Sequence, residues 1–215
     1  MGLAVRTGAW AKSGSPTPTA YGGLRFTAEA SNSSVQLTAV GSAPAVTLIK
    51  SFDGVNWEDY TVGEVIDLPS IGDFVYLAAG EGGNETFGSS TSNYHKFVIN
   101  GLVAASGDIT SLISFDLEHT TLAAYCYNNM FYGCTGLTSA PELPATTLAA
   151  NCYRNMFYGC TKLSLIKVHF TAWGTQTSAW VSNVPSTGTF YKPSALPDEF
   201  STDRIPTGWT VVNID

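Results

Sequence analysis

The residues with the most reactive side chains in this chain are four cysteines, which stand at matching positions of two near-identical segments. They are Cys126, Cys134, Cys152 and Cys160. Thiolates could bind zinc or form disulfides, but the seven residues between the members of each pair exceed the two to four of a metal knuckle. Free cysteine is among the most buried residue types. We therefore expect a ladder of buried thiols, each stacked on its copy, and no metal site.

The histidines show no spacing that defines a catalytic or metal site. His95, His119 and His169 lie far apart in the sequence, and none has a neighbour at ligand spacing. The chain also contains no Gly-x-Ser-x-Gly elbow, phosphate loop or dinucleotide fingerprint. We expect no catalytic residues, no cofactor and no enzyme activity.

The carboxylates give equally little indication of catalysis. Asp53, Glu58 and Asp59 crowd a hairpin, where a solvated turn is favoured over a calcium site because the spacing is not that of an EF-hand. Asp116 and Glu142 lie near the repeated segment. A glycosidase needs two carboxylates facing one sugar, and nothing in their spacing demands that arrangement.

Composition narrows the class of partner. Only 13% of the 215 residues are charged, the net charge is −7, and lysine and arginine form no cluster. A nucleic-acid partner is therefore not expected, since phosphate binding needs grouped cations. No apolar run is long enough to span a bilayer. The start of the chain does not read as a secretory signal, because Arg6 follows a very short apolar stretch.

The cysteines lie inside an internal repeat. Residues 120–137 read TTLAAYCYNNMFYGCTGL and residues 146–163 read TTLAANCYRNMFYGCTKL, an offset of 26 with three of eighteen positions different. A period of this length indicates units that stack to bury their apolar faces. The differences are Tyr125/Asn151, Asn128/Arg154 and Gly136/Lys162.

Each repeat divides into two predicted elements. Leu122, Cys126, Met130 and Cys134 recur at helical spacing, which predicts a helical turn over 122–134 that ends at Gly133. Residues 137–144 are then extended, because two prolines exclude a helix. Beyond the repeats we expect a strand at 165–170, a short terminal helix at 171–184 and another strand at 188–192. Residues 205–212 close the chain, and this tryptophan-rich tail is expected to form a cap.

The first half reads as an arm followed by strands. Residues 1–22 form the predicted arm and linker, in which Val5 and Trp10 are candidates for docking in an assembly. Residues 23–105 form a predicted Ig-like β-sandwich, with an Asp53-Gly54 hairpin turn. The predicted strands cover 35–39, 46–49, 73–79 and 96–103, and a polar loop covers 80–93. Residues 106–215 form the predicted repeat domain with its cap.

The repeated motif carries a family resemblance. Phe131 to Leu137 and Phe157 to Leu163 each read Phe-Tyr-Gly-Cys-Thr-x-Leu. This pattern resembles the BspA-like leucine-rich repeats of surface proteins of gut bacteria and of phages that infect them. The segments 188–193 and 205–211 are similar to that family's closing segment. The resemblance implies adhesion to host or cell-surface components and no shared catalytic site.

The candidate contact residues are repeat positions expected to point outward, including two that vary between copies. Tyrosine, asparagine and arginine can stack on a sugar ring and bind its hydroxyls. The alternative is that the variable positions vary because nothing constrains them. The candidates are Tyr125, Asn128, Asn129 and Tyr132, with their copies Asn151, Arg154, Asn155 and Tyr158.

Taken together, the sequence predicts a mainly β protein with short helices and a binding function. We expect a phage virion-associated tail or head decoration or fibre protein that binds a host-surface or mucosal glycan or protein. The alternative is an exported bacterial cell-surface adhesin of the BspA-like type. The expected location is the virion or the cell surface, and the expected further partners are virion or surface proteins at the arm, or a second copy of the chain. A glycan-cleaving enzyme and a purely structural capsid cement are less favoured.

Overall fold

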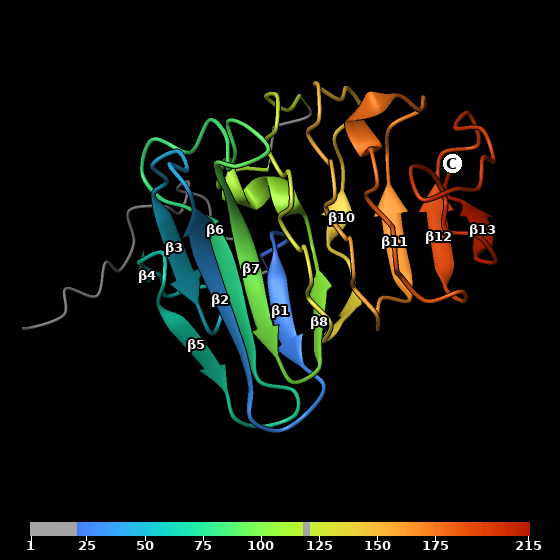
Figure 1. Ribbon diagram of the computed structural model, residues 1–215. Coiled ribbons are helices and arrows are strands. Elements are labelled where there is room, and N and C mark those ends of the chain that lie inside the picture. The colour runs from blue at the N-terminus through green and yellow to red at the C-terminus, as the bar shows by residue number, and fades with distance from the viewer. Residues whose placement is uncertain (1–20, 118–120) are drawn as a thin grey trace, which may run out of the picture.

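The computed structural model describes residues 21–117 and 121–215, and this part of the chain is mainly β (Figure 1). Val5 and Trp10 of the predicted arm lie outside the described residues. Strands of two sheets make up the first half. In chain order they are β1 (Arg25–Ala28), β2 (Ser33–Val40), β3 (Leu48–Ser51), β4 (Glu58–Tyr60), β5 (Val65–Leu68), β6 (Phe74–Ala79), β7 (Tyr94–Asn100) and β8 (Val103–Ser106).

The two sheets of the first half pack on a common core. One has the order β4-β3-β6-β1-β8-β9, where β9 is Leu137–Ser139, and the other has the order β5-β2-β7. The rings of Phe26 in β1 and Phe97 in β7 lie 4.8 Å apart across the interface. Strands occur in all four stretches where the sequence predicts them, but the stretch 96–103 is two strands and not one. Gly101, with φ of 75°, separates β7 from β8 and sends the chain from one sheet to the other.

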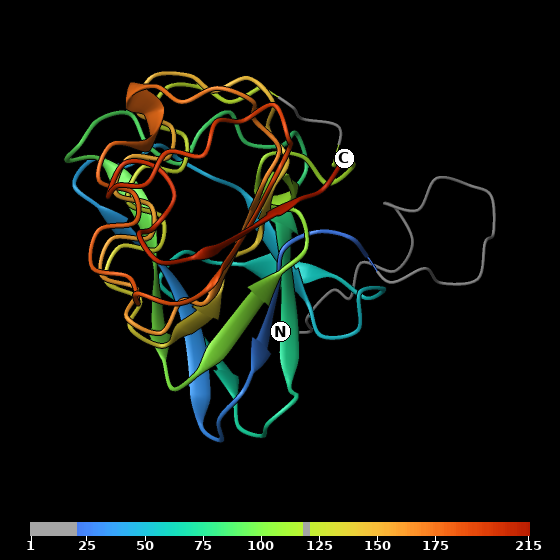
Figure 2. The same cartoon turned by 90° about the vertical axis from the view of Figure 1, so that its right-hand side faces the viewer.

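The second half is a stack of rungs, each a set of turns followed by a short strand. We call residues 121–145 the first rung, 147–170 the second and 173–192 the third. Their strands lie side by side in a parallel sheet, which Figure 2 views nearly along the stack. This sheet has the order β10 (Glu142–Leu143), β11 (Leu165–Val168), β12 (Thr189–Lys192) and β13 (Thr210–Asn213). The extended conformation predicted for 137–144 and the strand predicted at 165–170 are confirmed.

The first part of each rung is a chain of tight turns. Its backbone N–H groups alternate between two kinds of partner, a carbonyl three residues back and a carbonyl of the next rung. Cys126 N–H donates to Ala123 O at 3.3 Å, and the next N–H, of Tyr127, donates to Cys152 O at 2.9 Å. The predicted helical turn over 122–134 is therefore wrong, because an α-helix directs its N–H groups to carbonyls of its own segment.

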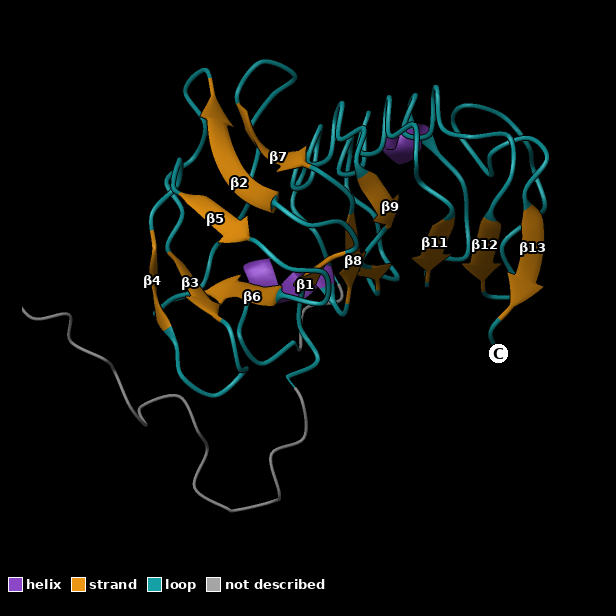
Figure 3. Cartoon of the chain, turned by 90° about the horizontal axis from the view of Figure 1, so that it is seen from below, coloured by secondary structure: helices purple, strands orange, loops and turns teal. Residues whose placement is uncertain are grey.

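The backbone of these turns repeats every four residues. Asn129 and Gly133 have φ of 59° and 74°, and Asn155 and Gly159 have 52° and 74° in the second rung. Asparagine and glycine are the residues that best tolerate this left-handed conformation. A four-residue repeat lies close to the 3.6-residue period of a helix, so side-chain spacing does not separate them. Figure 3 shows the turns as a row of narrow loops opposite the parallel strands.

A third set of turns stands where the sequence predicts a terminal helix at 171–184. That prediction is wrong, since the helical residues in this stretch are the three of η2 (Thr175–Thr177), a single 3₁₀ turn. The described chain has one more 3₁₀ helix, η1 (Ile109–Leu112), which lies before the first rung. Asn155 N–H donates to Ser178 O at 2.9 Å and Phe157 N–H donates to Trp180 O at 2.8 Å. The segment therefore continues the stack in register, although its sequence no longer matches the repeat.

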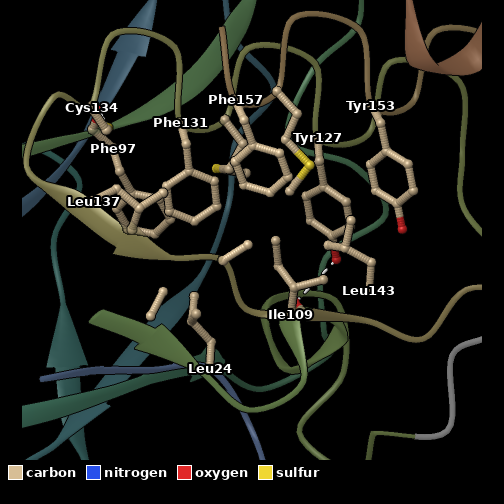
Figure 4. Close-up of a cluster of buried hydrophobic side chains, with 14 of the residues drawn as sticks. Leu24, Phe97, Ile109, Tyr127, Phe131, Cys134, Leu137, Leu143, Tyr153 and Phe157 are labelled. Atoms are coloured by element: carbon tan, nitrogen blue, oxygen red, sulfur yellow. Dashed lines mark hydrogen bonds between the residues drawn. The ribbon is translucent and has the colours of Figure 1, made fainter. Parts of the chain in front are cut away.

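Aromatic side chains from successive rungs stack inside the core (Figure 4). The ring of Phe131 lies 5.1 Å from Phe97 on one side and 5.6 Å from Phe157 on the other. Beside this row, the rings of Tyr127 and Tyr153 stack at 6.2 Å. Stacking of like side chains explains why the buried positions are identical in the two copies.

The strands of the first half cover the open side of the first rung. Phe97 N–H donates to Met130 O at 2.7 Å, and Val103 N–H donates to Gly136 O at 3.0 Å. β8 also pairs in parallel with β9, so one sheet continues past residue 105, the boundary that the sequence predicts. A single cluster of buried residues includes members of both halves.

The two stacked tyrosines allow a matched test of buried polar groups. Tyr127 Oη donates to Ile109 O at 3.2 Å, whereas Tyr153 Oη is buried and has no hydrogen-bond partner among the described residues. We expect Tyr127→Phe to lower the free energy of unfolding by about 1 kcal/mol. Tyr153→Phe is expected to leave it unchanged or to raise it, because the substitution removes an unsatisfied hydroxyl. Urea unfolding of both variants measures the difference, and equal losses would contradict this account.

Candidate ligand-binding surface

The four cysteines are free and buried, as predicted. Two of the thiols repeat the same contact one rung apart: Cys134 Sγ donates to Phe97 O at 3.2 Å and Cys160 Sγ donates to Phe131 O at 3.1 Å. Residues 21–117 and 121–215 contain no group of three metal-ligating side chains that could hold an ion. Packing of the rungs therefore accounts for the placement of the thiols.

The histidines of the described chain are held in separate structural contacts, and His119 lies outside it. The His95 ring is buried, its Nδ1 is 3.1 Å from Phe87 O, and burial lowers its pKa. His169 Nε2 is 2.6 Å from Glu142 Oε1, which also accepts from Lys167 Nζ at 2.9 Å. These contacts join neighbouring strands of the parallel sheet.

The hairpin carboxylates have structural contacts of their own. Asp53 Oδ1 accepts from the backbone N–H groups of Val55 and Asn56 at 2.8 and 2.7 Å, and these bonds hold the pKa of Asp53 below its usual range. Glu58 forms an ion pair with Lys50 at 3.5 Å. Asp53 therefore closes the Asp-Gly turn predicted from the sequence.

A pocket of about 660 Å³ opens between the two sheets of the first half. Ala39 and His95, paired across β2 and β7, contribute to its lining together with Leu48 and Tyr60 from the opposite sheet. Tyr60 Oη accepts from Leu37 N–H at 2.8 Å and donates to Glu64 O at 2.9 Å. Apolar side chains share the lining with Glu58, Asp59 and His95, and none of the eight candidate contact residues belongs to it.

The structure separates the eight candidate contact residues into different groups. Tyr132 and Tyr158 come together on the surface: their rings stack at 5.0 Å with an interplanar angle of 12°, and Tyr132 is 39% exposed. Tyr125, Asn129, Asn151 and Asn155 share a different property, because each is a left-handed residue of the turns. Local backbone geometry therefore accounts for the asparagines at three of these four positions.

The expected outward orientation of two candidates is wrong. Asn128 is 1% exposed and Asn129 is 5% exposed. Asn128 Nδ2 donates to Ser90 O at 3.1 Å, so the loop that precedes β7 lies over this part of the first rung. Arg154, the residue at this position in the second copy, is only partly buried.

The positions where the two copies differ lie close to the first half in the first copy. A Cβ atom at Gly136 would lie 1.9 Å from Gly101 O, whereas the second copy has an exposed lysine at this position. A Cβ atom at Gly88 would lie 2.6 Å from Tyr125 O, so the backbone segments at residues 88 and 125 also approach closely. With Asn128, all three differing positions of the first copy touch or approach residues 88–101. The second copy is free of this constraint.

The surface that remains for a ligand is the tyrosine row and its surroundings on the second rung. Tyr94 of β7, which the sequence did not indicate, belongs to the same region. Burial and the neighbouring Tyr132 raise the pKa of the Tyr94 phenol. Tyr94 lies outside the repeat, so no periodicity could have identified it.

Comparison with known proteins gave no match to a protein family, to a curated protein or to a solved structure. Within residues 21–117 and 121–215, none of the helices has the length and hydrophobicity needed to cross a bilayer.

The left-handed positions provide a test of the turn geometry. We expect Asn155→Ala to lower the free energy of unfolding by about 1 kcal/mol, because a Cβ-bearing residue without a compensating side chain is strained at this φ. Asn155→Gly is the matched control and should unfold at the same urea concentration as the wild type, or higher. An equal loss in both variants would contradict the assignment of Asn155 to a backbone role.

The thiols provide a test of rung packing. Burial raises the pKa of Cys126, Cys134 and Cys152 to about 12 and that of Cys160 well above its usual range. A thiol-reactive dye should therefore label none of the four cysteines in the native protein at pH 8 and all four in urea. The pKa of each thiol is higher in the folded than in the unfolded state. The thiols therefore make their full contribution to the free energy of unfolding below about pH 8.5, and this contribution falls as the pH rises toward 12. Rapid labelling of the native protein would contradict this packing.

Proposed function

We propose that this chain is a non-enzymatic binding protein that displays its rungs to a host-surface or mucosal glycan or protein. The observation that carries the proposal is the stacked pair of Tyr132 and Tyr158 on the surface. Aromatic rings held rigidly at a surface supply contact area at low entropic cost, and their hydroxyls hydrogen-bond polar ligands. The low charge of the chain is compatible with a neutral, polar display surface.

The fold is proposed to combine two modules that act together. We interpret the two sheets over 23–105 as an Ig-like β-sandwich and residues 106–215 as BspA-like leucine-rich repeats with a closing cap. Support comes from the shared core of the two sheets and from the parallel strands that recur once per rung. In this interpretation the sandwich serves as the N-terminal cap that a stack of repeats requires.

The proposed setting is a phage virion, as a tail or head decoration or fibre protein. Residues 1–22, with Val5 and Trp10, would attach the chain to other virion proteins. The alternative is an exported bacterial adhesin with the same binding surface. Detection of the chain in purified virions would support the first setting, and detection on the surface of uninfected bacteria would support the second.

The binding function can be tested with immobilised mucin and capsular glycans. We expect Tyr132→Ala/Tyr158→Ala to weaken binding about tenfold, because the variant removes both rings of the contact surface, and a tenfold change corresponds to about 1.4 kcal/mol. Tyr191→Ala, a partly buried tyrosine on the strand side of the rungs, is the matched control and should bind as the wild type does.

Two outcomes would contradict the proposal. Unchanged binding by the double variant would exclude the tyrosine pair as the contact surface. Release of free sugar that Glu142→Gln abolishes would identify a glycan-cleaving enzyme instead.

A further inference from the structure

The exposed tyrosine row stops one rung before the stack of turns does. Gly133 N–H donates to Tyr158 O at 2.8 Å, and Gly159 N–H donates to Ser182 O at 2.8 Å. By this register, Tyr132, Tyr158 and Ser182 occupy the same position in three successive rungs. Ser182 therefore stands where a third ring would continue the row. The small serine leaves the face of Tyr158 that points toward the third rung without an aromatic partner.

The turn before Tyr158 carries a cation. Arg154 occupies the equivalent position one turn earlier in the same rung, four residues before Tyr158. No ion pair involves Arg154 among the described residues, and its Nε is buried without a hydrogen-bond partner. The counterparts in the first and third rungs are Asn128 and Ser178, so the second rung alone carries a charge here.

We propose that Tyr158, Arg154 and Ser182 form a binding site for a sugar that carries a carboxylate, such as a hexuronic acid unit of a glycan. This inference rests on the proposed function and narrows it to acidic glycans. The sugar ring packs on the open face of Tyr158, over Ser182, and continues the row. Its carboxylate accepts hydrogen bonds from the Arg154 guanidinium, whose planar donors match a carboxylate.

The geometry favours a glycan over an acidic peptide. The position over Ser182 continues a row in which ring centroids lie 5.0 Å apart, so the C–H face of a pyranose ring can pack there on Tyr158. The surrounding side chains, Ser182 and Ser178, are small, neutral hydrogen-bonding groups. In a protein with net charge −7, an unpaired arginine is also one of few cations that can attract an anion.

The test compares a hyaluronan tetrasaccharide with the same tetrasaccharide after reduction of its carboxyl groups to alcohols. Isothermal titration with the full chain should give a dissociation constant about tenfold lower for the acidic probe, because a charge-assisted hydrogen bond is worth about that factor. Arg154→Asn, which copies the first repeat, should abolish the preference. Lys162→Gly also copies the first repeat and removes one exposed positive charge, so it is the matched control and should keep the preference.

A second pair of variants tests the open ring face. Ser182→Tyr should fold, because the row already accommodates a tyrosine at this position in two rungs, and it should block binding of the acidic probe. Ser182→Ala should bind normally. Thermal unfolding of each variant establishes that it is folded before binding is measured.

The outcomes separate this inference from the proposed function. Equal affinity for the acidic and reduced probes, or a preference that survives Arg154→Asn, would overturn the acidic-sugar site and leave glycan binding intact. Binding of a polyglutamate peptide without binding of the tetrasaccharide would overturn the sugar assignment. Failure to bind any glycan, including mucin, would overturn both.

Discussion

Backbone hydrogen bonds between rungs are the constraint on which the second half of this protein depends. Every second N–H of the turns, such as those of Tyr125 and Tyr127, donates to the next rung, and those between donate within their own rung. This alternation satisfies the backbone without an α-helix or a regular strand. It also places equivalent residues directly above one another. Buried cysteines and aromatic rings therefore stack on their own copies.

A stack held in this way needs a cover at both ends, because a terminal rung offers unpaired backbone groups and an apolar face. The sheets of the first half cover the first rung through β7 and β8. At the other end, Trp180 Nε1 donates to Arg204 O at 2.7 Å and Ala179 N–H donates to Asp203 Oδ1 at 2.7 Å. The chain thus closes its own stack, and the intervening second rung keeps its turn surface free of either cover.

The covering of the first rung by the first half changes how the sequence differences between the two copies are interpreted. From the sequence, Tyr125/Asn151, Asn128/Arg154 and Gly136/Lys162 are either ligand contacts or unconstrained positions. The structure adds a third cause for Asn128 and Gly136, since both meet residues 90–101 of the first half. Candidate ligand contacts are then confined to the second copy and to the tyrosine row, whose members do not differ between copies.

Much of the local structure followed from the sequence alone. The period of 26 residues determined that like residues would stack, and the burial of the four thiols followed because cysteine is apolar and stands at equivalent positions. Prolines and alternating residues determined the extended segments. The two sheets of the first half could be placed only as separate strands, since pairing between distant segments leaves little trace in a single sequence.

Tertiary structure alone decided the conformation of the turns and the composition of the surface. A four-residue turn and a helix space their side chains almost alike, and only bonding to a neighbouring rung distinguishes them. The third rung, with Trp180 and Ser182, keeps the register but not the residues, so repetition of sequence could not reveal it. Whether Asn128 or Arg154 reaches solvent depends on which of them the loop before β7 covers, and that loop folds over the first rung alone.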